Sequence, residues 1–355
     1  MMAELVAERS ILVCCGPGGV GKTTVAAALA VEAARTGRRT VVVTIDPARR
    51  LADALGLDSL SNTPKRVEGD WPGELWALML DPRSTFDGLV AKYAPDPGQA
   101  EAILANRFYR NIAGALSGTQ EYMAMEKLYE LHGDARFDLV VVDTPPTRNA
   151  LDFVDAPRRL TRFLDNRLFR LLMLPARTGI KAVNLATQAL LRTIGKVVGS
   201  EVVTDAVTFF QAFEGMEEGF RQRAARVQHL LAEPATAFVL VASPRRDATR
   251  ETEFFAEKLG QAGIAVQALV VNRMHPRFSP LPALPAETTA AAAGTPLAPL
   301  LRNVAELTRM ADGEEAHVAS LASRLAAPAV RVPELETDVH DLPGLARVAA
   351  YVFAG

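Results

Sequence analysis

Short apolar runs alternate with longer helical stretches along the chain, and this pattern predicts the architecture. Seven runs rich in β-branched and other apolar residues are typical of strands: 11–15, 40–45, 75–80, 139–142, 237–242, 265–271 and 330–335. Several are apolar at every position, as expected for parallel strands covered on both faces. Because helical stretches separate them, we predict an α/β fold with a doubly wound, mostly parallel sheet.

Two segments contain no strand pattern. Residues 83–133 predict two or three helices with a break at 95–98, and residues 153–235 predict helix almost throughout. Apolar residues in the second segment recur every three or four positions, which predicts one stripe on a long helix: Val202, Val203, Ala206, Phe209, Phe210, Phe213, Met216 and Phe220. We predict that 83–133 and 153–235 form a helical insertion in a domain made of 1–82, 134–152 and 236–355.

The remaining C-terminal part changes character twice. Residues 278–299 are rich in Pro and Ala, which is typical of a surface loop or linker. A helix over 300–325, a last strand and a short helix near 345–353 are predicted to follow.

Composition narrows the class of protein. The chain has 355 residues, 49% of them hydrophobic, and a net charge of −2, so no basic field favours nucleic acid. Its two cysteines fit a reducing compartment, and an acidic N-terminus without an apolar segment does not resemble a signal peptide. No run of about 18 uncharged apolar residues suggests a membrane span. We therefore expect a cytoplasmic protein.

The most informative motif lies between the first predicted strand and the first predicted helix. It reads Gly-x-x-x-x-Gly-Lys-Thr, a phosphate loop in its usual strand–loop–helix setting. Its backbone N–H groups and the helix N-terminus would surround phosphates, Lys22 would reach the β- and γ-phosphates, and the Thr23 hydroxyl would bind Mg²⁺. The predicted nucleotide-binding residues are Gly16, Gly18, Gly19, Val20, Gly21, Lys22, Thr23 and Thr24.

Three other strand ends carry polar residues. Asp143 ends the fourth apolar run, where phosphate-loop enzymes place an Asp that helps hold Mg²⁺, usually through water. Asp46 follows the second run and could polarise an attacking water, although Asp-Pro also starts many turns. Asn272 and Arg273 end the sixth run; the Asn amide suits the edge of an adenine ring, but a strand-end cap is an equal alternative.

Taken in order, these motifs resemble the ArsA-type ATPase family, which includes an arsenite-pump ATPase and an ATPase that targets tail-anchored membrane proteins. The residues that carry the resemblance are the phosphate loop, 46–48, 118–126, 143–147, 271–273 and the tail 332–342. They span nearly the whole chain, and the similarity is greatest to a bacterial, actinobacterial-type branch in which two such ATPases can be neighbours and assemble together.

The resemblance implies a SIMIBI-like phosphate-loop ATPase that uses ATP and Mg²⁺. It implies that Asp46 is the catalytic carboxylate alongside Lys22, that Asn272 binds adenine, and that a second switch consists of Asp143, Thr144, Pro145, Pro146 and Thr147. Family members work as dimers that open and close a helical subdomain, and the targeting enzymes form an apolar groove for a client helix there. In this chain the groove would be lined by Val203, Phe209, Phe210, Phe213, Met216 and Phe220, which could equally be core.

The chain also departs from the family pattern. Most members carry a lysine directly after the first glycine of the loop that reaches the partner's phosphates, whereas this chain has Pro17. Either another cation substitutes, or activity is weak, or the chain pairs with a lysine-bearing paralogue. Arg148 and the pair 49–50 are candidate cations. We expect no zinc, because a Cys-x-x-Cys motif is absent, and no arsenite, because Cys14 and Cys15 would face opposite sides of one strand.

Three functions follow from these observations. The first is a dimeric ATPase switch that binds a protein client or partner, with transient contact to a membrane. The second is a weakly catalytic nucleotide-binding subunit that regulates a lysine-bearing paralogue, as Pro17 suggests. The third is a ParA-like positioning ATPase, against which the neutral charge and the large helical insertion count.

Overall fold

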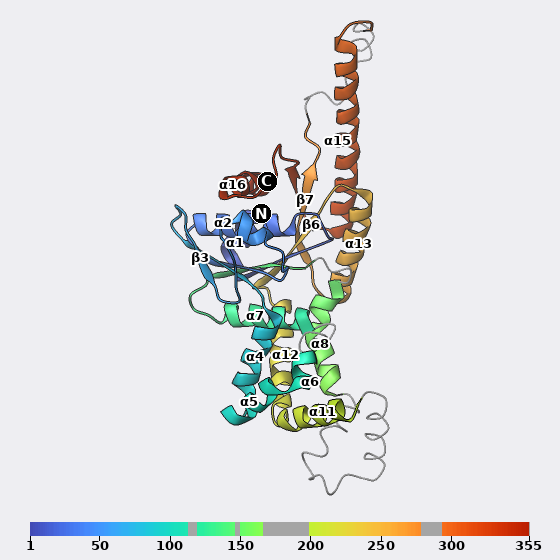
Figure 1. The fold of residues 1–355 in the computed structure, drawn as a ribbon. Coiled ribbons are helices and arrows are strands. Elements are labelled where there is room, and N and C mark those ends of the chain that lie inside the picture. Colours follow the sequence, from blue (N-terminus) through green and yellow to red (C-terminus); the bar gives the residue numbers. More distant parts are fainter. Residues whose placement is uncertain (113–118, 146–149, 166–198, 278–292, 355) are drawn as a thin grey trace. The chain divides into compact units, whose positions relative to one another are not determined.

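The computed structural model describes residues 1–112, 119–145, 150–165, 199–277 and 293–354. The chain divides into two compact units (Figure 1). The first, called the sheet unit, comprises Met1–Met79, Asp134–Ala150 and Pro234–Gly355. The second, the helical unit, comprises Leu80–Gly133 and Leu151–Glu233.

An eight-stranded sheet organises the sheet unit, in the order β3-β4-β2-β5-β1-β6-β7-β8. All neighbouring strands run parallel except β3, which pairs antiparallel with β4 at one edge. The strands are β1 (Ile11–Cys15), β2 (Arg39–Thr44), β3 (Lys65–Val67), β4 (Glu74–Met79), β5 (Leu139–Asp143), β6 (Thr236–Ala242), β7 (Val266–Met274) and β8 (Ala329–Pro333). The predicted α/β class with a mostly parallel sheet is confirmed, while β3 was not predicted.

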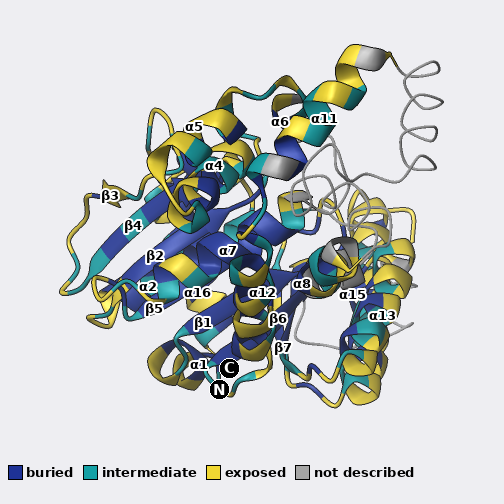
Figure 2. Ribbon diagram, turned by 90° about the horizontal axis from the view of Figure 1, so that it is seen from below, coloured by how far each residue is buried: buried dark blue, intermediate teal, exposed yellow. Residues whose placement is uncertain are grey.

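The central strands are apolar at every position because both of their faces are covered. Every residue of β1, β5 and β6 is buried, and Figure 2 shows these strands in dark blue. One face packs against α2 (Lys22–Arg35), α16 (Leu342–Phe353) and α1 (Met2–Glu8). The small side chains of α2, Ala26–Ala28 among them, allow this helix to lie close to the sheet and to α16. This packing fixes the helix that starts at the phosphate loop.

Two further helices support the β6–β8 end of the sheet. They are α13 (Arg246–Gln261) and the long α15 (Leu297–Leu325), which contact β6, β7 and β8. An ion pair of 2.6 Å between Arg324 and Glu253 joins the two helices. The helix predicted over 300–325 is therefore confirmed and begins slightly earlier. Within the loop predicted over 278–299, residues 278–292 lie outside the described part of the chain.

The described helical unit contains seven helices: α4 (Pro82–Tyr93), α5 (Pro97–Ala105), α6 (Arg107–Ile112), α7 (Thr119–His132), α8 (Ala150–Leu164), α11 (Ser200–Ala212) and α12 (Glu217–Ala232). Four of them fall in 83–133, one more than predicted. The prediction of one long helix through Val202–Phe220 is wrong, because the chain turns between α11 and α12. Gly215 lies in that turn at φ 88°, a left-handed conformation that glycine adopts readily.

A buried ion pair joins two helices of this unit. The Arg223 guanidinium on α12 donates to Glu126 on α7, with Nε 2.6 Å from Oε1, and lies over the Tyr129 ring at 3.7 Å. Removing either charge would leave the other buried without a partner, so the pair fixes the pairing of α7 with α12. Among the described helices, none combines the length and apolar character needed to cross a bilayer.

Candidate nucleotide site

The phosphate loop connects β1 to α2 and depends on glycine at two positions. Gly16 has φ 147°, and a Cβ there would clash with the backbone oxygen of Val241. Gly21 caps α2 at φ 94°, and a Cβ there would clash with the Asn272 amide. Both positions therefore combine a backbone conformation that favours glycine with a neighbour that excludes any side chain.

Lys22 is the first residue of α2 and turns back over its own loop. Its Nζ donates to the backbone oxygen of Pro17 at 2.8 Å, and only 6% of the residue is exposed. Burial lowers the pKa of the amine, an effect partly offset by the Asp143 carboxylate. A phosphate in the loop would give this buried amine an anionic acceptor in place of a carbonyl.

Asp143 at the end of β5 collects the hydroxyls of two threonines. Thr23 on α2 and Thr44 on β2 each donate to Asp143 Oδ2 at 2.8 Å. The register of β2 on β5 places Thr44 directly beside Asp143. Burial raises the pKa of this carboxyl to about 6, against the hydrogen bonds from Thr23 and Thr44, which lower it. Within the described residues its Oδ1 atom is buried without a hydrogen-bond partner.

Asp46 follows β2 at the same edge of the sheet. Its Oδ1 accepts from the backbone N–H of Ala48 at 3.0 Å, a turn that fixes the direction of the side chain. Its Oδ2 lies 3.5 Å from Arg50 Nη1. The side chain of Asp46 is 18% exposed and faces the cavity, so a small ligand could reach it.

Asn272 and Arg273 at the end of β7 hold the phosphate loop from the other side. Asn272 Nδ2 donates to the backbone oxygen of Val20 at 2.9 Å, and Arg273 Nη1 donates to that of Gly19 at 3.2 Å. Arg273 adopts φ 60°, which is uncommon outside glycine. The Asn272 amide keeps a second N–H and further acceptor capacity for a ligand such as adenine, so this role stays a prediction.

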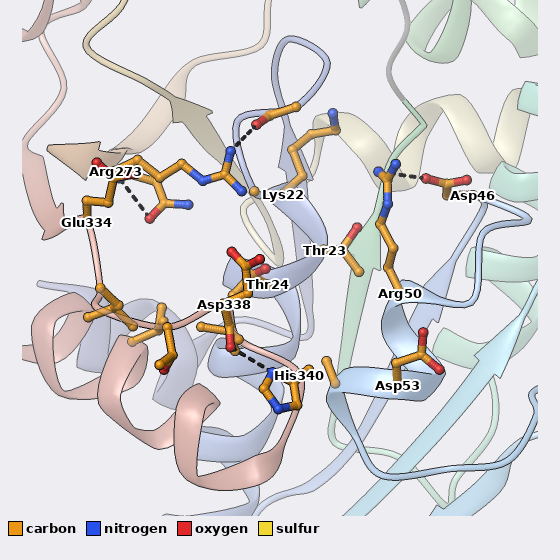
Figure 3. Close-up of a pocket in the computed structure, with 18 of the residues that line it drawn as sticks. Lys22, Thr23, Thr24, Asp46, Arg50, Asp53, Arg273, Glu334, Asp338 and His340 are labelled. Atoms are coloured by element: carbon orange, nitrogen blue, oxygen red, sulfur yellow. Dashed lines mark hydrogen bonds and ion pairs between the residues drawn. The ribbon is translucent and has the colours of Figure 1, made fainter.

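Most of these groups line one cavity of about 620 Å³ at the carboxyl end of the sheet (Figure 3). Of the predicted site residues, those that line it are Gly19, Gly21, Lys22, Thr23, Thr24, Asp46, Thr144, Asn272 and Arg273. Gly16 and Asp143 lie behind the lining, and Val20 contributes a backbone acceptor. Pro146 and Thr147 of the predicted second switch, and the candidate cation Arg148, lie outside the described residues.

Sequence reasoning missed part of this lining. The segment Pro333–His340 between β8 and α16 closes one side of the cavity, with Glu334, Asp338 and His340 among its polar residues. The role of Thr44 was also missed, whereas Arg50 lines the cavity and belongs to the pair 49–50 named above as candidate cations. Thr44 could have been found from its position as the last residue of a strand next to the Asp143 strand. The tail 332–342 was recognised as similar to the family, but its sequence did not place it at the cavity.

A family model described as anion-transporting ATPase matches residues 9–280. The chain belongs to this family. It is 33% identical over 276 residues to an uncharacterized protein of Streptomyces coelicolor, covering 77% of this chain and 64% of that protein. It is 25% identical over 275 residues to the ATPase GET3 of Malassezia globosa, covering 77% and 76%. The predicted resemblance to ArsA-type ATPases is thereby confirmed.

Coverage of the relatives varies. The chain is 29% identical over 287 residues to the ATPase ARSA1 of Chlamydomonas reinhardtii, covering 76% of this chain but 35% of that protein. It therefore spans less than two thirds of both this relative and the Streptomyces protein. Several relatives are named ATPases, which fits the nucleotide chemistry of the loop.

The residues predicted to line a client groove lie in the aromatic core of the helical unit. Phe209, Phe210 and Phe213 are 5–8% exposed, and Met216 and Phe220 at most 1%. The Phe220 ring lies 5.2 Å from that of Phe213 and 5.3 Å from that of Tyr93. In this conformation the residues predicted to line the groove are core, except Val203, which is partly exposed. A groove over these residues would need the helices to separate.

Proposed function

We propose that the chain is a Mg-ATP-dependent ATPase switch whose helical unit binds a protein client or partner. The observation that carries this proposal is that Lys22 and Thr23 line one cavity behind a glycine-rich loop, with the Thr23 hydroxyl bonded to the buried Asp143 carboxylate behind it. A buried amine, a helix N-terminus and a carboxylate at a neighbouring strand end are the groups that phosphoryl transfer requires. Membership of an ATPase family supports the same function.

The residues around Asp143 fit Mg²⁺. The ion prefers oxygen ligands and usually keeps several waters. The Thr23 hydroxyl and Asp143 would hold it, since Asp143 Oδ1 is buried and lacks a hydrogen-bond partner among the described residues. Bound there, Mg²⁺ would neutralise charge on the β- and γ-phosphate oxygens. Asp46 would orient the attacking water, and its turn with Ala48 holds it ready for that task.

The helical unit is the proposed binding element for a client or partner. Its aromatic stripe supplies apolar area that an opened form could offer to an apolar helix. We further propose that the chain works as a dimer, either with itself or with a lysine-bearing paralogue. Pro17 carries no charge, so a partner's lysine could act at the site built on Lys22, whereas this chain offers none from that position in return.

ATP turnover by the purified chain tests the proposal, with Lys22→Ala and Asp46→Asn as controls and with a lysine-bearing paralogue added. Robust turnover that both substitutions abolish is the result expected of a self-sufficient enzyme. Turnover that appears only with the paralogue would instead identify the chain as one half of a heteromeric ATPase. Absence of turnover dependent on Lys22 in both settings would rule out the catalytic proposal.

A further inference from the structure

Among the described residues, three lysine or arginine side chains line the cavity, and they differ in their hydrogen-bond and ionic partners. Lys22 donates to the backbone oxygen of Pro17, and Arg273 donates to that of Gly19. Within the described part of the chain, Arg50 makes no hydrogen bond and has one ionic partner, Asp46. Of these three side chains, Arg50 is therefore the one that can most easily leave its present partner and turn toward a ligand.

The geometry of the Arg50–Asp46 pair argues against a role in stability. Arg50 Nη1 lies 3.5 Å from Asp46 Oδ2, longer than a charge-assisted hydrogen bond, and the arginine side chain is 69% exposed. Exposed pairs of this kind contribute about 1 kcal/mol or less. The same side chain lines the cavity beside Thr23 and Lys22 (Figure 3).

The charge of Arg50 acts on Lys22, the residue that lies at the phosphate-binding end of the cavity. Burial is the largest cause of the lowered pKa of the Lys22 amine; the carboxylates of Asp143 and Asp46 oppose it, and the positive charge of Arg50 adds a smaller lowering effect. The guanidinium and the amine thus lie within electrostatic reach of each other. An anion bound near both would relieve their repulsion, which favours a phosphate group over a neutral ligand at this end.

The neighbouring arginine shows that this placement is specific. Arg49 points away from the cavity and donates through Nη2 to the backbone oxygen of Asp58. It lines a separate cavity of about 180 Å³ with Ala48 and Leu60. Arg50 therefore lines the nucleotide cavity, whereas the adjacent Arg49, which has the same charge, lines a different one.

We propose that Arg50 supplies, from the same chain, the positive charge that stabilises the γ-phosphate of ATP in the transition state. This inference rests on the proposed ATPase function and names a further catalytic residue for it. The loop contributes one charged side chain, Lys22, because residues 16–21 carry none. When ATP binds, Arg50 exchanges Asp46 for the γ-phosphate, and Asp46 is released to orient water.

The reaction explains why the charge is needed. The bond from the γ-phosphorus to the bridging oxygen breaks with its electron pair left on ADP, and a bond to the water oxygen forms. One water proton stays on the inorganic phosphate, and the other leaves to solvent. Negative charge spreads over the transferred group during this exchange, and an arginine in place to meet it accelerates such reactions by about 10³–10⁵-fold.

The test compares Arg50→Ala, Arg50→Lys and the control Arg49→Ala. Turnover is measured with whichever preparation is active, and affinity is measured for fluorescent ADP and for ADP with aluminium fluoride, which mimics the transferred phosphoryl group. Arg50→Ala is expected to lower kcat at least about 100-fold and to weaken the fluoride complex similarly, while ADP affinity changes less than about 3-fold. Arg50→Lys should recover part of the loss, and Arg49→Ala should behave as the wild type.

Two results would overturn the inference. One is an Arg50→Ala variant that keeps wild-type affinity for the fluoride complex or loses ADP affinity equally. The other is an Arg50→Ala change that leaves the affinity for the fluoride complex unaltered in an Asp46→Asn background, since Arg50 would then act only by holding Asp46. The fluoride complex needs no turnover, so it tests Arg50 even where the wild type fails to hydrolyse ATP and the proposed function is wrong.

Discussion

Asp143 combines complete burial with hydrogen bonds from two hydroxyls, and the two effects oppose each other. Removal from water favours the neutral acid, while Thr23 and Thr44 favour the carboxylate; burial is the larger effect and raises the pKa to about 6. A carboxyl kept at the edge of ionisation is suited to a site that gains a cation, because the cation restores the charged form.

The raised pKa makes stability without metal depend on pH. Between about pH 4 and pH 6 the folded protein binds a proton at Asp143 that the unfolded chain has lost, so stability falls as the pH rises. The loss amounts to about 3 kcal/mol by pH 7. Urea unfolding in the presence of a chelator measures the free energy of unfolding at each pH. It should fall between about pH 4 and pH 7 in the wild type, and this contribution should be missing in Asp143→Asn. The amide oxygen of Asn still accepts from both threonines, so the variant removes the titration and keeps these hydrogen bonds.

The difference between the two proteins is the quantity to compare, because other groups that titrate in this range are common to both. Equal slopes for wild type and Asp143→Asn would show that the Asp143 carboxyl does not bind a proton in this range, and the raised pKa would be wrong.

At the scale of elements, strands were predicted well where burial makes every position apolar, as in β1 and β5. The short β3 escaped prediction because it has three residues, of which Lys65 and Arg66 are exposed. It pairs at a sheet edge and needs no apolar face. The turn between α11 and α12 escaped because Phe213 and Met216 continue the apolar spacing through it and are themselves buried. The spacing of apolar residues indicates which positions are buried, but it does not show where one helix ends and the next begins in another direction.

The aromatic core gives a prediction at this scale. Phe220→Ala removes a fully buried ring that contacts Phe86, Tyr93 and Phe213, so it should lower the free energy of unfolding by about 3–5 kcal/mol. The matched control is Phe254→Ala, since Phe254 is 47% exposed and its ring has a contact of 5.4 Å with Lys258. The control should cost about 1 kcal/mol or less. Denaturant unfolding measures both.

The result also decides between core and groove. A Phe220→Ala protein as stable as the control, with weaker binding of an apolar helical peptide, would show that the stripe serves a ligand and not the packing of the unit.

At the scale of the whole molecule, the site is made of strand ends that lie far apart in the sequence. Asp46, Asp143 and Asn272 could be predicted because a parallel sheet brings the carboxyl ends of its strands to one edge, where ligands bind. Pro333–His340 could not, because its contribution depends on how the chain after β8 returns to α16. That course is set by tertiary packing; the tail 332–342 resembles the family, but its local sequence does not show that it reaches the cavity.

For the chain to act as a switch, ATP bound in the sheet unit must also alter the conformation or stability of the helical unit. Binding alone stabilises the unit that holds the ligand, by about 2.7 kcal/mol at a hundredfold excess over Kd. Hydrogen exchange with and without a non-hydrolysable Mg-ATP analogue separates the two cases. We expect slower exchange around Lys22 and Asp46, and altered exchange in α11 and α12 that Lys22→Ala abolishes. Protection confined to the sheet unit would mean that this chain binds nucleotide without coupling it to the helices, and its function would then be that of a nucleotide-binding regulatory subunit.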